Sequence, residues 1–276
     1  MTQTEAAPAK LNLALHVTGR RGDGYHLIDS LVAFAAVGDE VALEPGPLSL
    51  EIRGPFASGL DAGPDNLCLR AARLAGMEAR ITLTKSLPVA AGIGGGSADA
   101  AAVLRGLGRM GAQLPAAPQV LGADVPVCLA GRPARMRGVG ELIEPVPALP
   151  RMSLVLVNPG VALSTPDVFG ALTQRDNPGL PPLPDAFDLA GLVGYLSACR
   201  NDLEAPAITL CPAVATVLRA LRDEGAMIAR MSGSGATCFG IFPDAAAAGL
   251  AAYRIGAAYE GWWITATGLA PHPKEV

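Results

Sequence analysis

The chain has 276 residues, of which 50% are hydrophobic and 17% charged, with a formal net charge of −4. This composition indicates a globular protein of one or two domains and excludes an intrinsically disordered chain. We find no basic run, no signal peptide and no apolar stretch near the ~18 residues of a membrane span. We therefore expect a cytoplasmic protein that binds neither nucleic acid nor membranes.

Cysteine and histidine usage gives no sign of a disulfide framework or a metal centre. The five cysteines are widely spaced and form no CxxC pair, which predicts reduced, buried thiols. The three histidines, His16, His26 and His272, do not group with the cysteines. No metal site built from protein ligands alone is therefore predicted.

The first part of the chain predicts strands around a turn. Residues 10–18, KLNLALHVT, alternate between apolar and polar side chains, as a half-buried strand does. GRRGDGYH (19–26) is a turn-rich loop, and it leads to a second apolar stretch at 31–37. Residues 40–44 predict a further, separate strand.

Helices and strands then mix without strict alternation. In order, the patterns predict a helix from Asn66 to Ala75 with Gly76 past its end, a strand at 81–85, a helix from residue 97 or 98 to 107, a buried strand within 147–160, a helix over 212–224, two strands around a glycine turn in 227–242, a helix over 244–259 and a strand at 262–268. This mixture favours an α+β protein over a doubly wound sheet. The proline-rich connector near residue 150 predicts a domain boundary there.

The stretch LPVAAGIGGGSADAAAV (87–103) puts four glycines between a predicted strand and a predicted helix. Glycine permits positive φ and lets an anion approach the main chain, and the free N–H groups of a helix start favour phosphate. Ser97 can add a hydrogen bond or cap the helix. The stretch is neither a Walker A motif nor a GxGxxG fingerprint. A tight turn without a ligand is the alternative.

Three further stretches accompany the glycines: PAKLNLALHVTGRRGDGYH (8–26), LGADVPVCLAG (121–131) and MSGSGATCFGIF (231–242). In this order and spacing the four stretches resemble the GHMP kinases over nearly the whole chain. The resemblance implies the two-domain α+β fold of that family, with ligand sites in the cleft between the domains. The implied N-terminal domain, 1–150, is like ribosomal protein S5 domain 2, and the implied C-terminal domain, 151–276, is an α/β sandwich.

The resemblance implies an ATP-dependent small-molecule kinase with Mg²⁺ bridging the β and γ phosphates. It assigns ATP binding to Pro88, Val89, Ala90, Ala91, Gly92, Ile93, Gly94, Gly95, Gly96, Ser97 and Ala98. It makes Asp124 the base that takes the acceptor hydroxyl proton, and Lys10 the cation that stabilises the charge of the transfer. From the residues alone, Asp124 could equally be a helix cap or turn residue, and Lys10 an exposed lysine at a strand end.

The opening PxKLNL with GRRxDGYH is the most specific part of the resemblance. It points to members of the family that act on a cytidine diphosphate-linked polyol in non-mevalonate isoprenoid synthesis. The implied substrate-binding residues are Asn12, Tyr25, His26, Thr165, Phe169, Gly233 and Ser234. Asn12 shares a strand face with Lys10, because residues i and i+2 point the same way.

Structural alternatives stand beside these assignments. Asn12 could be a surface residue, Phe169 a core residue, and the turn at 232–236 a plain β-turn. We assign Asp99 no chemistry and expect it to cap a helix or to be solvated. The chain also departs from the family in having Ala98 where a second serine is common, and a short segment at 109–120 before LGADVP.

Two rival functions remain open at this point. One is a GHMP kinase for another alcohol, of the homoserine or mevalonate type, and the other is a non-catalytic nucleotide-binding protein on this fold. The GDGYH loop argues against the first, because those substrates have no base to stack. The presence of both Lys10 and Asp124 argues against the second. The sequence leaves the oligomeric state open, a weak homodimer included.

Overall fold

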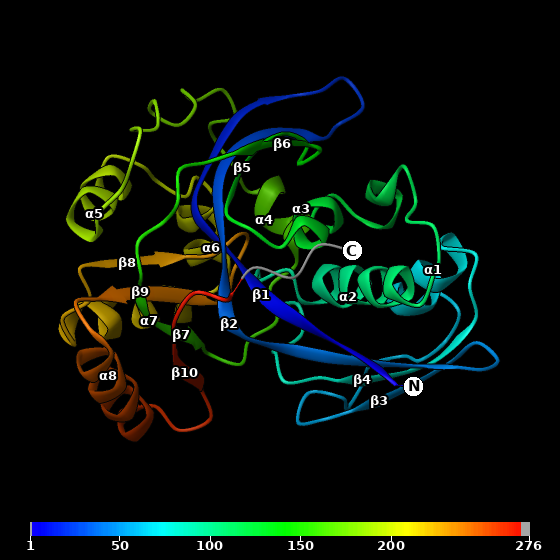
Figure 1. The fold of residues 1–276 in the computed structure, drawn as a ribbon. Coiled ribbons are helices and arrows are strands. Elements are labelled where there is room, and N and C mark those ends of the chain that lie inside the picture. The colour runs from blue at the N-terminus through cyan, green and yellow to red at the C-terminus, as the bar shows by residue number, and fades with distance from the viewer. Residues whose placement is uncertain (1, 272–276) are drawn as a thin grey trace.

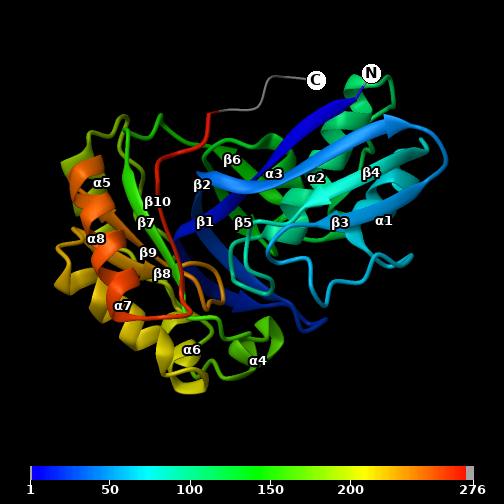
Figure 2. The ribbon, with the colours of Figure 1, turned by 90° about the horizontal axis from the view of Figure 1, so that it is seen from below.

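The computed structural model describes residues 2–271, so His272 lies outside the described residues. The expected α+β class is confirmed: two antiparallel or mixed sheets lie side by side, and helices cover them (Figures 1 and 2). The first sheet contains β1 to β6 and the second contains β7 to β10.

A long antiparallel hairpin forms the centre of the molecule. Strand β1 (Gln3–Arg20) pairs with β2 (His26–Pro45) over nearly its whole length. The prediction of separate segments at 31–37 and 40–44 was wrong, because β2 is continuous. Gly38 does not break the strand but lets the two backbones approach, since a Cβ there would lie 2.4 Å from the Ala7 carbonyl oxygen.

The other edge of β2 pairs with β5 near its start and with β4 near its end. The remaining strands of this sheet are β3 (Ser49–Arg53), β4 (Ala79–Thr84), β5 (Ala134–Gly138) and β6 (Leu142–Pro145). The predicted strand at 81–85 corresponds to β4. Sequence reasoning missed β3, β5 and β6, which are short and carry several charged residues.

Three helices and a 3₁₀ turn pack on the first sheet and lead to the cleft described below. They are α1 (Leu67–Leu74), α2 (Gly95–Arg109), η1 (Pro118–Leu121) and α3 (Val125–Ala130). The predicted cap of α1 is confirmed, because Asn66 Oδ1 accepts a 2.9 Å hydrogen bond from the Cys68 amide. Alanines along α2 are fully buried, which lets the helix pack closely against β1 and β2.

The second sheet has the order β10-β7-β9-β8 and is antiparallel throughout. Its strands are β7 (Ser153–Asn158), β8 (Ile228–Met231), β9 (Cys238–Phe242) and β10 (Trp263–Thr267). The predicted strands within 147–160, 227–242 and 262–268 are therefore confirmed.

The helices of the second half are α4 (Thr165–Gly170), α5 (Leu189–Ser197), α6 (Glu204–Leu210), α7 (Ala213–Asp223) and α8 (Ala245–Ala258). The helices predicted at 212–224 and 244–259 are α7 and α8. Sequence reasoning missed α4, α5 and α6, the first of which carries two of the expected substrate residues.

The core runs through both halves of the chain. Along β7, Leu154 and Leu156 pack with Leu11 and Leu13 of β1, whereas the alternate residues of β7 pack under α7 and α8. The second sheet therefore lies between its own helices and the β1–β2 hairpin. The five cysteines are all buried and free, as expected.

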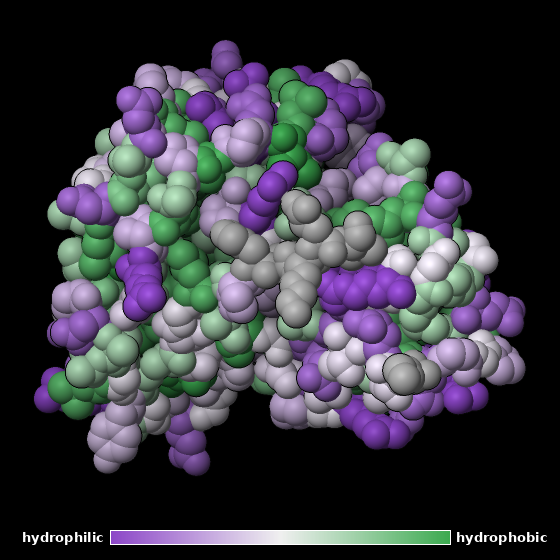
Figure 3. All heavy atoms as spheres, in the orientation of Figure 1, coloured by the Kyte–Doolittle hydropathy of each residue, from purple (hydrophilic) through white to green (hydrophobic). Residues whose placement is uncertain are grey.

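Within residues 2–271, no helix is long and apolar enough to cross a membrane. On the face shown in Figure 3, hydrophilic and hydrophobic residues are interspersed.

Candidate active site

A cleft with a volume of about 1100 Å³ opens between segments that are far apart in the sequence. Its lining comes from β1, the tip of the β1–β2 hairpin, the starts of α1 and α2, the turn before α3, α4 and the turn at 232–236. Volumes of this size are typical of small-molecule sites. The cleft is therefore the candidate functional site.

The glycine loop, residues 88–98, joins β4 to α2 and forms one wall of the cleft. Gly94 has φ +65° and precedes the first residue of α2, and a Cβ there would lie 3.2 Å from Lys10 Cβ. Ser97 lies inside the first turn of this helix and is not its cap residue, because Gly94 occupies the cap position. No side chain makes a capping hydrogen bond. The uncapped N–H groups at the start of α2 belong to cleft-lining residues, an arrangement that favours an anion.

The glycine loop rests on the turn at 232–236. Ser232 Oγ donates to the Gly92 carbonyl at 3.0 Å, and the Thr237 amide donates to the Ala91 carbonyl at 3.1 Å. A Cβ on Gly92 would lie 2.5 Å from the Ser232 carbonyl oxygen, so this contact requires glycine. Gly92 also has φ +73°, which favours glycine independently.

Lys10 and Asp124 meet in the cleft although 114 residues separate them. Lys10 Nζ donates to Asp124 Oδ2 at 2.8 Å. Lys10 is not at a strand end but within β1, at a register shift, and it is only 4% exposed. Asp124 immediately precedes α3, but its side chain does not cap that helix. The alternative of an exposed lysine is therefore wrong for Lys10. Asp124 does lie in the turn before α3, but its carboxylate contacts Lys10 and makes no capping hydrogen bond.

Asn12 lines the cleft beside Lys10, as the strand spacing predicts. It is 1% exposed, so the surface alternative is wrong. Its Nδ2 donates to Ser30 Oγ at 2.8 Å, and its backbone amide donates to Ser232 Oγ at 3.1 Å. Its Oδ1 is buried without a partner among the described residues. That oxygen is available to a donor on a ligand.

The hairpin tip brings aromatic residues to the far end of the cleft. The His26 ring stacks on Phe169 of α4, with centroids 4.8 Å apart and planes 23° apart. Tyr25 is 64% exposed beside them. Burial lowers the pKa of His26, and the charges of Arg20 and Arg175 lower it further. The imidazole is therefore neutral near pH 7, and its buried Nε2 has no partner among the described residues.

Thr165, at the start of α4, shares a 2.7 Å hydrogen bond with Ser234. Gly233 and Ser234 line the cleft, so the turn at 232–236 is more than a plain β-turn. Asn201, which sequence reasoning missed, holds this turn by donating from Nδ2 to the Met231 and Gly233 carbonyls at 2.8 Å each.

Every expected site residue lines the cleft except Ile93 and Ala98. Ile93 is buried in the shared core, but its carbonyl accepts a 2.9 Å hydrogen bond from the Lys10 amide. Ala98 faces the core under α2. A serine at position 98 would therefore direct its Cβ towards the core, so the departure from the family pattern leaves the cleft lining intact.

Two buried charged residues of the cleft were not recognised from the sequence. Asp99 neither caps a helix nor is solvated, because it is 3% exposed and accepts a hydrogen bond from Lys85. The only signal for Asp99 was one carboxylate inside an alanine run, and for Lys85 its place directly after a strand.

The chain matches the family model for the GHMP kinases N terminal domain over residues 66–132, and that for GHMP kinases C terminal over 187–261. The chain belongs to the GHMP kinase family. The expected family, its two-domain architecture and a small-molecule kinase activity are thereby confirmed. Membership of this family implies that the protein uses ATP.

Individual GHMP kinases are similar to the chain over nearly its full length. It is 66% identical to the 4-diphosphocytidyl-2-C-methyl-D-erythritol kinase of Paracoccus denitrificans, covering 97% of each chain. It is 58% identical to the enzyme of that name from Cereibacter sphaeroides, covering 97% of this chain and 99% of that one.

Solved structures agree with this assignment. A crystal structure of 4-(cytidine 5'-diphospho)-2C-methyl-D-erythritol kinase superposes with a TM-score of 0.80 at 36% identity, covering 97% of this chain and 99% of that one. Homoserine kinase from Cytophaga hutchinsonii superposes with a TM-score of 0.69 at 17% identity, covering 97% and 95%. The second likeness concerns the fold alone.

Proposed function

We propose that the protein transfers the γ-phosphoryl group of ATP to the 2-hydroxyl of 4-diphosphocytidyl-2-C-methyl-D-erythritol, yielding ADP and the 2-phosphate. The observation that carries this proposal is one cleft that holds the Lys10–Asp124 pair, the glycine loop and the His26–Phe169 stack. The names of the similar proteins support the same substrate.

The acceptor hydroxyl would be activated by Asp124. Phosphoryl transfer asks mainly for alignment, for neutralisation of charge and for a group that orients the nucleophile. Asp124 lines the cleft and would take that last role, with its carboxylate accepting the hydroxyl proton. Lys10 contacts that carboxylate at 2.8 Å and would stabilise the charge that develops on the transferred group.

The triphosphate would lie along the glycine loop, residues 88–98. Backbone N–H groups at the start of α2 provide fixed donors, and the helix dipole adds to their effect. Gly233 and Ser234 line the same cleft next to the glycine loop, and their backbone amides would share the negative charge.

The cytosine would bind at the hairpin tip. Tyr25 offers an exposed ring face for stacking, and His26 offers a neutral imidazole whose Nε2 is unpartnered among the described residues. Phe169 backs the His26 ring. Asn12 and Thr165 line the same cleft, where they would contact the polyol or its diphosphate.

The residues present fit a Mg²⁺ ion held with the phosphates. Magnesium in kinase sites takes one or two protein oxygens, the rest being phosphate oxygens and water. Ser97 supplies a hydroxyl in the lining of the cleft, and this hydroxyl approaches the turn before α3, since a Cβ on Gly122 would lie 3.6 Å from Ser97 Oγ. When bound, the ion neutralises charge on the β and γ phosphates.

The proposal extends to the organisation of the chain. We assign residues 1–150 to an N-terminal GHMP kinase domain and 151–276 to a C-terminal one, with the reaction in the cytoplasm. No nucleic acid or membrane partner is proposed, and a weak homodimer is compatible with a cleft that one chain completes.

A coupled assay of ADP release tests the function directly. The purified protein is incubated with Mg²⁺-ATP and, in separate reactions, with the cytidylyl substrate, homoserine and mevalonate. We expect turnover with the cytidylyl substrate alone. Turnover with another alcohol would identify a different GHMP kinase, and ATP binding without turnover of any alcohol would favour a nucleotide-binding protein.

A further inference from the structure

Three buried charged residues lie beneath the glycine loop and take no part in the function proposed above. Lys85 Nζ donates to Asp39 Oδ2 at 2.5 Å and to Asp99 Oδ2 at 2.8 Å. None of the three side chains is more than 4% exposed. Burying charges costs several kcal/mol per ion, and apolar residues of similar size often stabilise a fold as well. These three residues therefore point to a role other than stability.

The triad, defined as Asp39, Lys85 and Asp99, connects the two ends of the glycine loop. Lys85 directly follows β4 and precedes the loop, whereas Asp99 lies in α2 just after it. Asp39 lies in β2, and its Oδ1 accepts the amides of Ser86 at 2.6 Å and Leu87 at 2.8 Å. The triad thus ties the start of the loop to its end, and both to the central hairpin.

The triad also reaches the nucleotide side of the cleft. A Cβ on Gly95 would lie only 3.1 Å from Lys85 Nζ, so the first residue of α2 sits directly over the ammonium. Lys85 and Asp99 both line the cleft, and Asp99 Oδ1 has no partner among the described residues. Burial and the neighbouring Asp39 raise the pKa of Asp99 to about 7 although Lys85 opposes the shift.

We propose that the Lys85–Asp99 contact, braced by Asp39, sets the position of the amides at 92–96 that receive the triphosphate, which makes Asp99 a positioning residue for ATP. This inference rests on the proposed function only in taking the glycine loop as the nucleotide site. It separates two tasks: the loop backbone binds the phosphates, and the triad fixes where that backbone lies.

The test compares Asp99→Leu with Asp99→Asn. The leucine removes the tether while the Lys85–Asp39 pair stays balanced, and the asparagine keeps an oxygen for Lys85. For Asp99→Leu we expect the Kd for ADP in calorimetry and the KM for ATP to rise about tenfold, with kcat within about threefold of wild type. For Asp99→Asn, the Kd for ADP and the KM for ATP should stay within about threefold of the wild-type values. Asp99→Ala, which adds no bulk, repeats the measurement if the leucine variant does not fold.

Amide hydrogen exchange gives a readout independent of activity. Exchange in the peptide covering 86–98 should accelerate in Asp99→Leu and not in Asp99→Asn, because the loop loses its tether. Glu5→Gln is the matched control: it alters a buried carboxylate that contacts Arg105 of the same helix, away from the loop. It should leave the Kd for ADP unchanged.

The outcomes separate the two proposals. The positioning role would be overturned if a folded Asp99→Leu or Asp99→Ala variant bound ADP with wild-type affinity. It would also be overturned if Asp99→Asn and Glu5→Gln lost as much affinity for ADP as Asp99→Leu. A wild type that binds ADP but phosphorylates none of the alcohols would overturn the proposed function and leave the triad result intact. A wild type that binds no nucleotide would overturn both.

Discussion

Polar atoms without a partner gather in the cleft. Asn12 Oδ1, His26 Nε2 and Asp99 Oδ1 are buried, belong to residues that line the cleft and have no hydrogen-bond partner among the described residues. Leaving such an atom unsatisfied costs about 1–3 kcal/mol. The three atoms therefore favour ligand binding over an empty cleft.

Lys10 and Asp124 differ in exposure, and this difference decides what a substitution at Asp124 tests. The Lys10 side chain is 5% exposed, but that of Asp124 is 33% exposed and so partly screened by water. Asp124→Asn keeps an oxygen that can accept from Lys10, so the fold should tolerate it. The carboxylate is lost, and with it the proton acceptor.

We expect Asp124→Asn to lower kcat by about 100-fold or more, because general-base catalysis contributes about 10²–10⁴-fold. The Kd for ADP should change by less than about threefold. Steady-state kinetics and calorimetry measure the two effects. Asp188→Asn, which exchanges one good helix cap for another at α5, is the control. Turnover near the wild-type value in Asp124→Asn would contradict the base assignment.

Tyr25→Ala tests the base-binding end of the cleft. A stacked base gains about 1–3 kcal/mol from an aromatic face, so KM for the cytidylyl substrate should rise about tenfold or more. The KM for ATP should not change. Tyr253→Ala on α8 removes another tyrosine that is 76% exposed and should leave both constants unchanged. A change confined to ATP would place the cytosine elsewhere.

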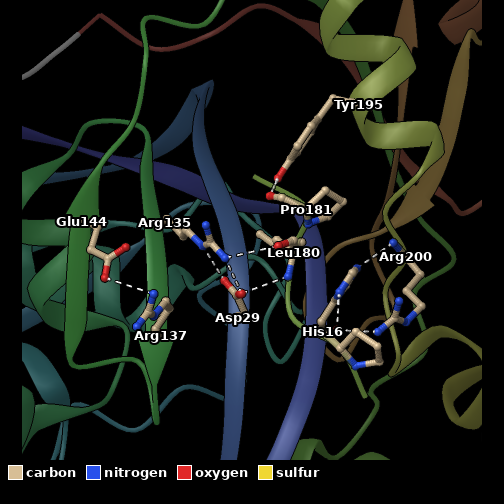
Figure 4. A network of polar contacts seen from close by, with 10 residues as sticks. His16, Asp29, Arg135, Arg137, Glu144, Leu180, Pro181, Tyr195 and Arg200 are labelled. Carbon is tan, nitrogen blue, oxygen red and sulfur yellow. Dashed lines mark hydrogen bonds and ion pairs between the residues drawn. The ribbon is translucent and has the colours of Figure 1, made fainter. Parts of the chain in front are cut away.

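A long irregular segment between α4 and α5, residues 171–188, is pinned to the first sheet by polar contacts (Figure 4). Arg135 of β5 makes a paired hydrogen bond with Asp29 of β2, at 2.8 and 2.6 Å, and Asp29 Oδ2 also accepts the Leu180 amide at 2.9 Å. Burial opposes ionisation of Asp29, but Arg135 and the Leu180 amide outweigh it and lower its pKa.

His16 of β1 connects the same segment to the residues after α5, because each ring nitrogen contacts one of them. Nδ1–H donates to the Pro178 carbonyl at 3.0 Å, and Nε2 accepts the Arg200 amide at 3.1 Å. Protonation would put a second N–H against the Arg200 amide. Burial lowers the pKa of His16 below 6.5, as does the Arg200 charge, whereas the Pro178 carbonyl and Asp202 oppose the shift.

The sign of the pH effect follows from this lowered pKa. Between the folded and the unfolded pKa, the unfolded chain binds more protons, so the free energy of unfolding falls as pH drops below 6.5. His16→Asn removes this contribution. We expect its stability deficit relative to wild type, about 1 kcal/mol near pH 7.5, to shrink towards pH 5.5. Urea unfolding measures it, and a deficit that is independent of pH would contradict the assignment.

At the scale of the whole molecule, the two halves share one apolar core. Leu11, Leu13 and Leu31 of the hairpin pack with Leu156 and Phe239 of the second sheet. A core that crosses the boundary near residue 150 couples the unfolding of both halves. The two proposed domains are thus units of architecture that depend on each other for burial.

We accordingly expect one calorimetric transition for the whole chain, with equal calorimetric and van't Hoff enthalpies. Ligands that bind in the cleft should raise the Tm of this transition without splitting the transition in two, because the cleft is built from both halves. Leu156→Ala, which cuts the shared core, should lower the Tm of that single transition. Two resolved transitions in the wild type would contradict the coupling.

Local patterns predicted much of the secondary structure. The Asn66 cap, the proline start of α7 and the apolar run of β7 each depend on a few neighbouring residues. The strands β3, β5 and β6 escaped prediction because each is only four or five residues long and depends on pairing with its neighbours, although SLEIR in β3 and ARMRG in β5 do alternate. Gly38 led to the wrong prediction of a break in β2 for a related reason, because its role depends on the facing backbone of β1.

The sequence by itself determined the family resemblance, the glycine loop and a set of site residues that, apart from Ile93 and Ala98, all line the cleft, because motif order and spacing are properties of the chain. Only the tertiary structure decided that Lys10 reaches Asp124, that His26 stacks on Phe169 and that Asp99 is buried against Lys85. Each of those facts depends on packing between separate elements. Long-range packing sets the distances between side chains and the burial of each one. A residue such as Asp99 can play several chemical roles, and its distances and burial determine which of them it plays.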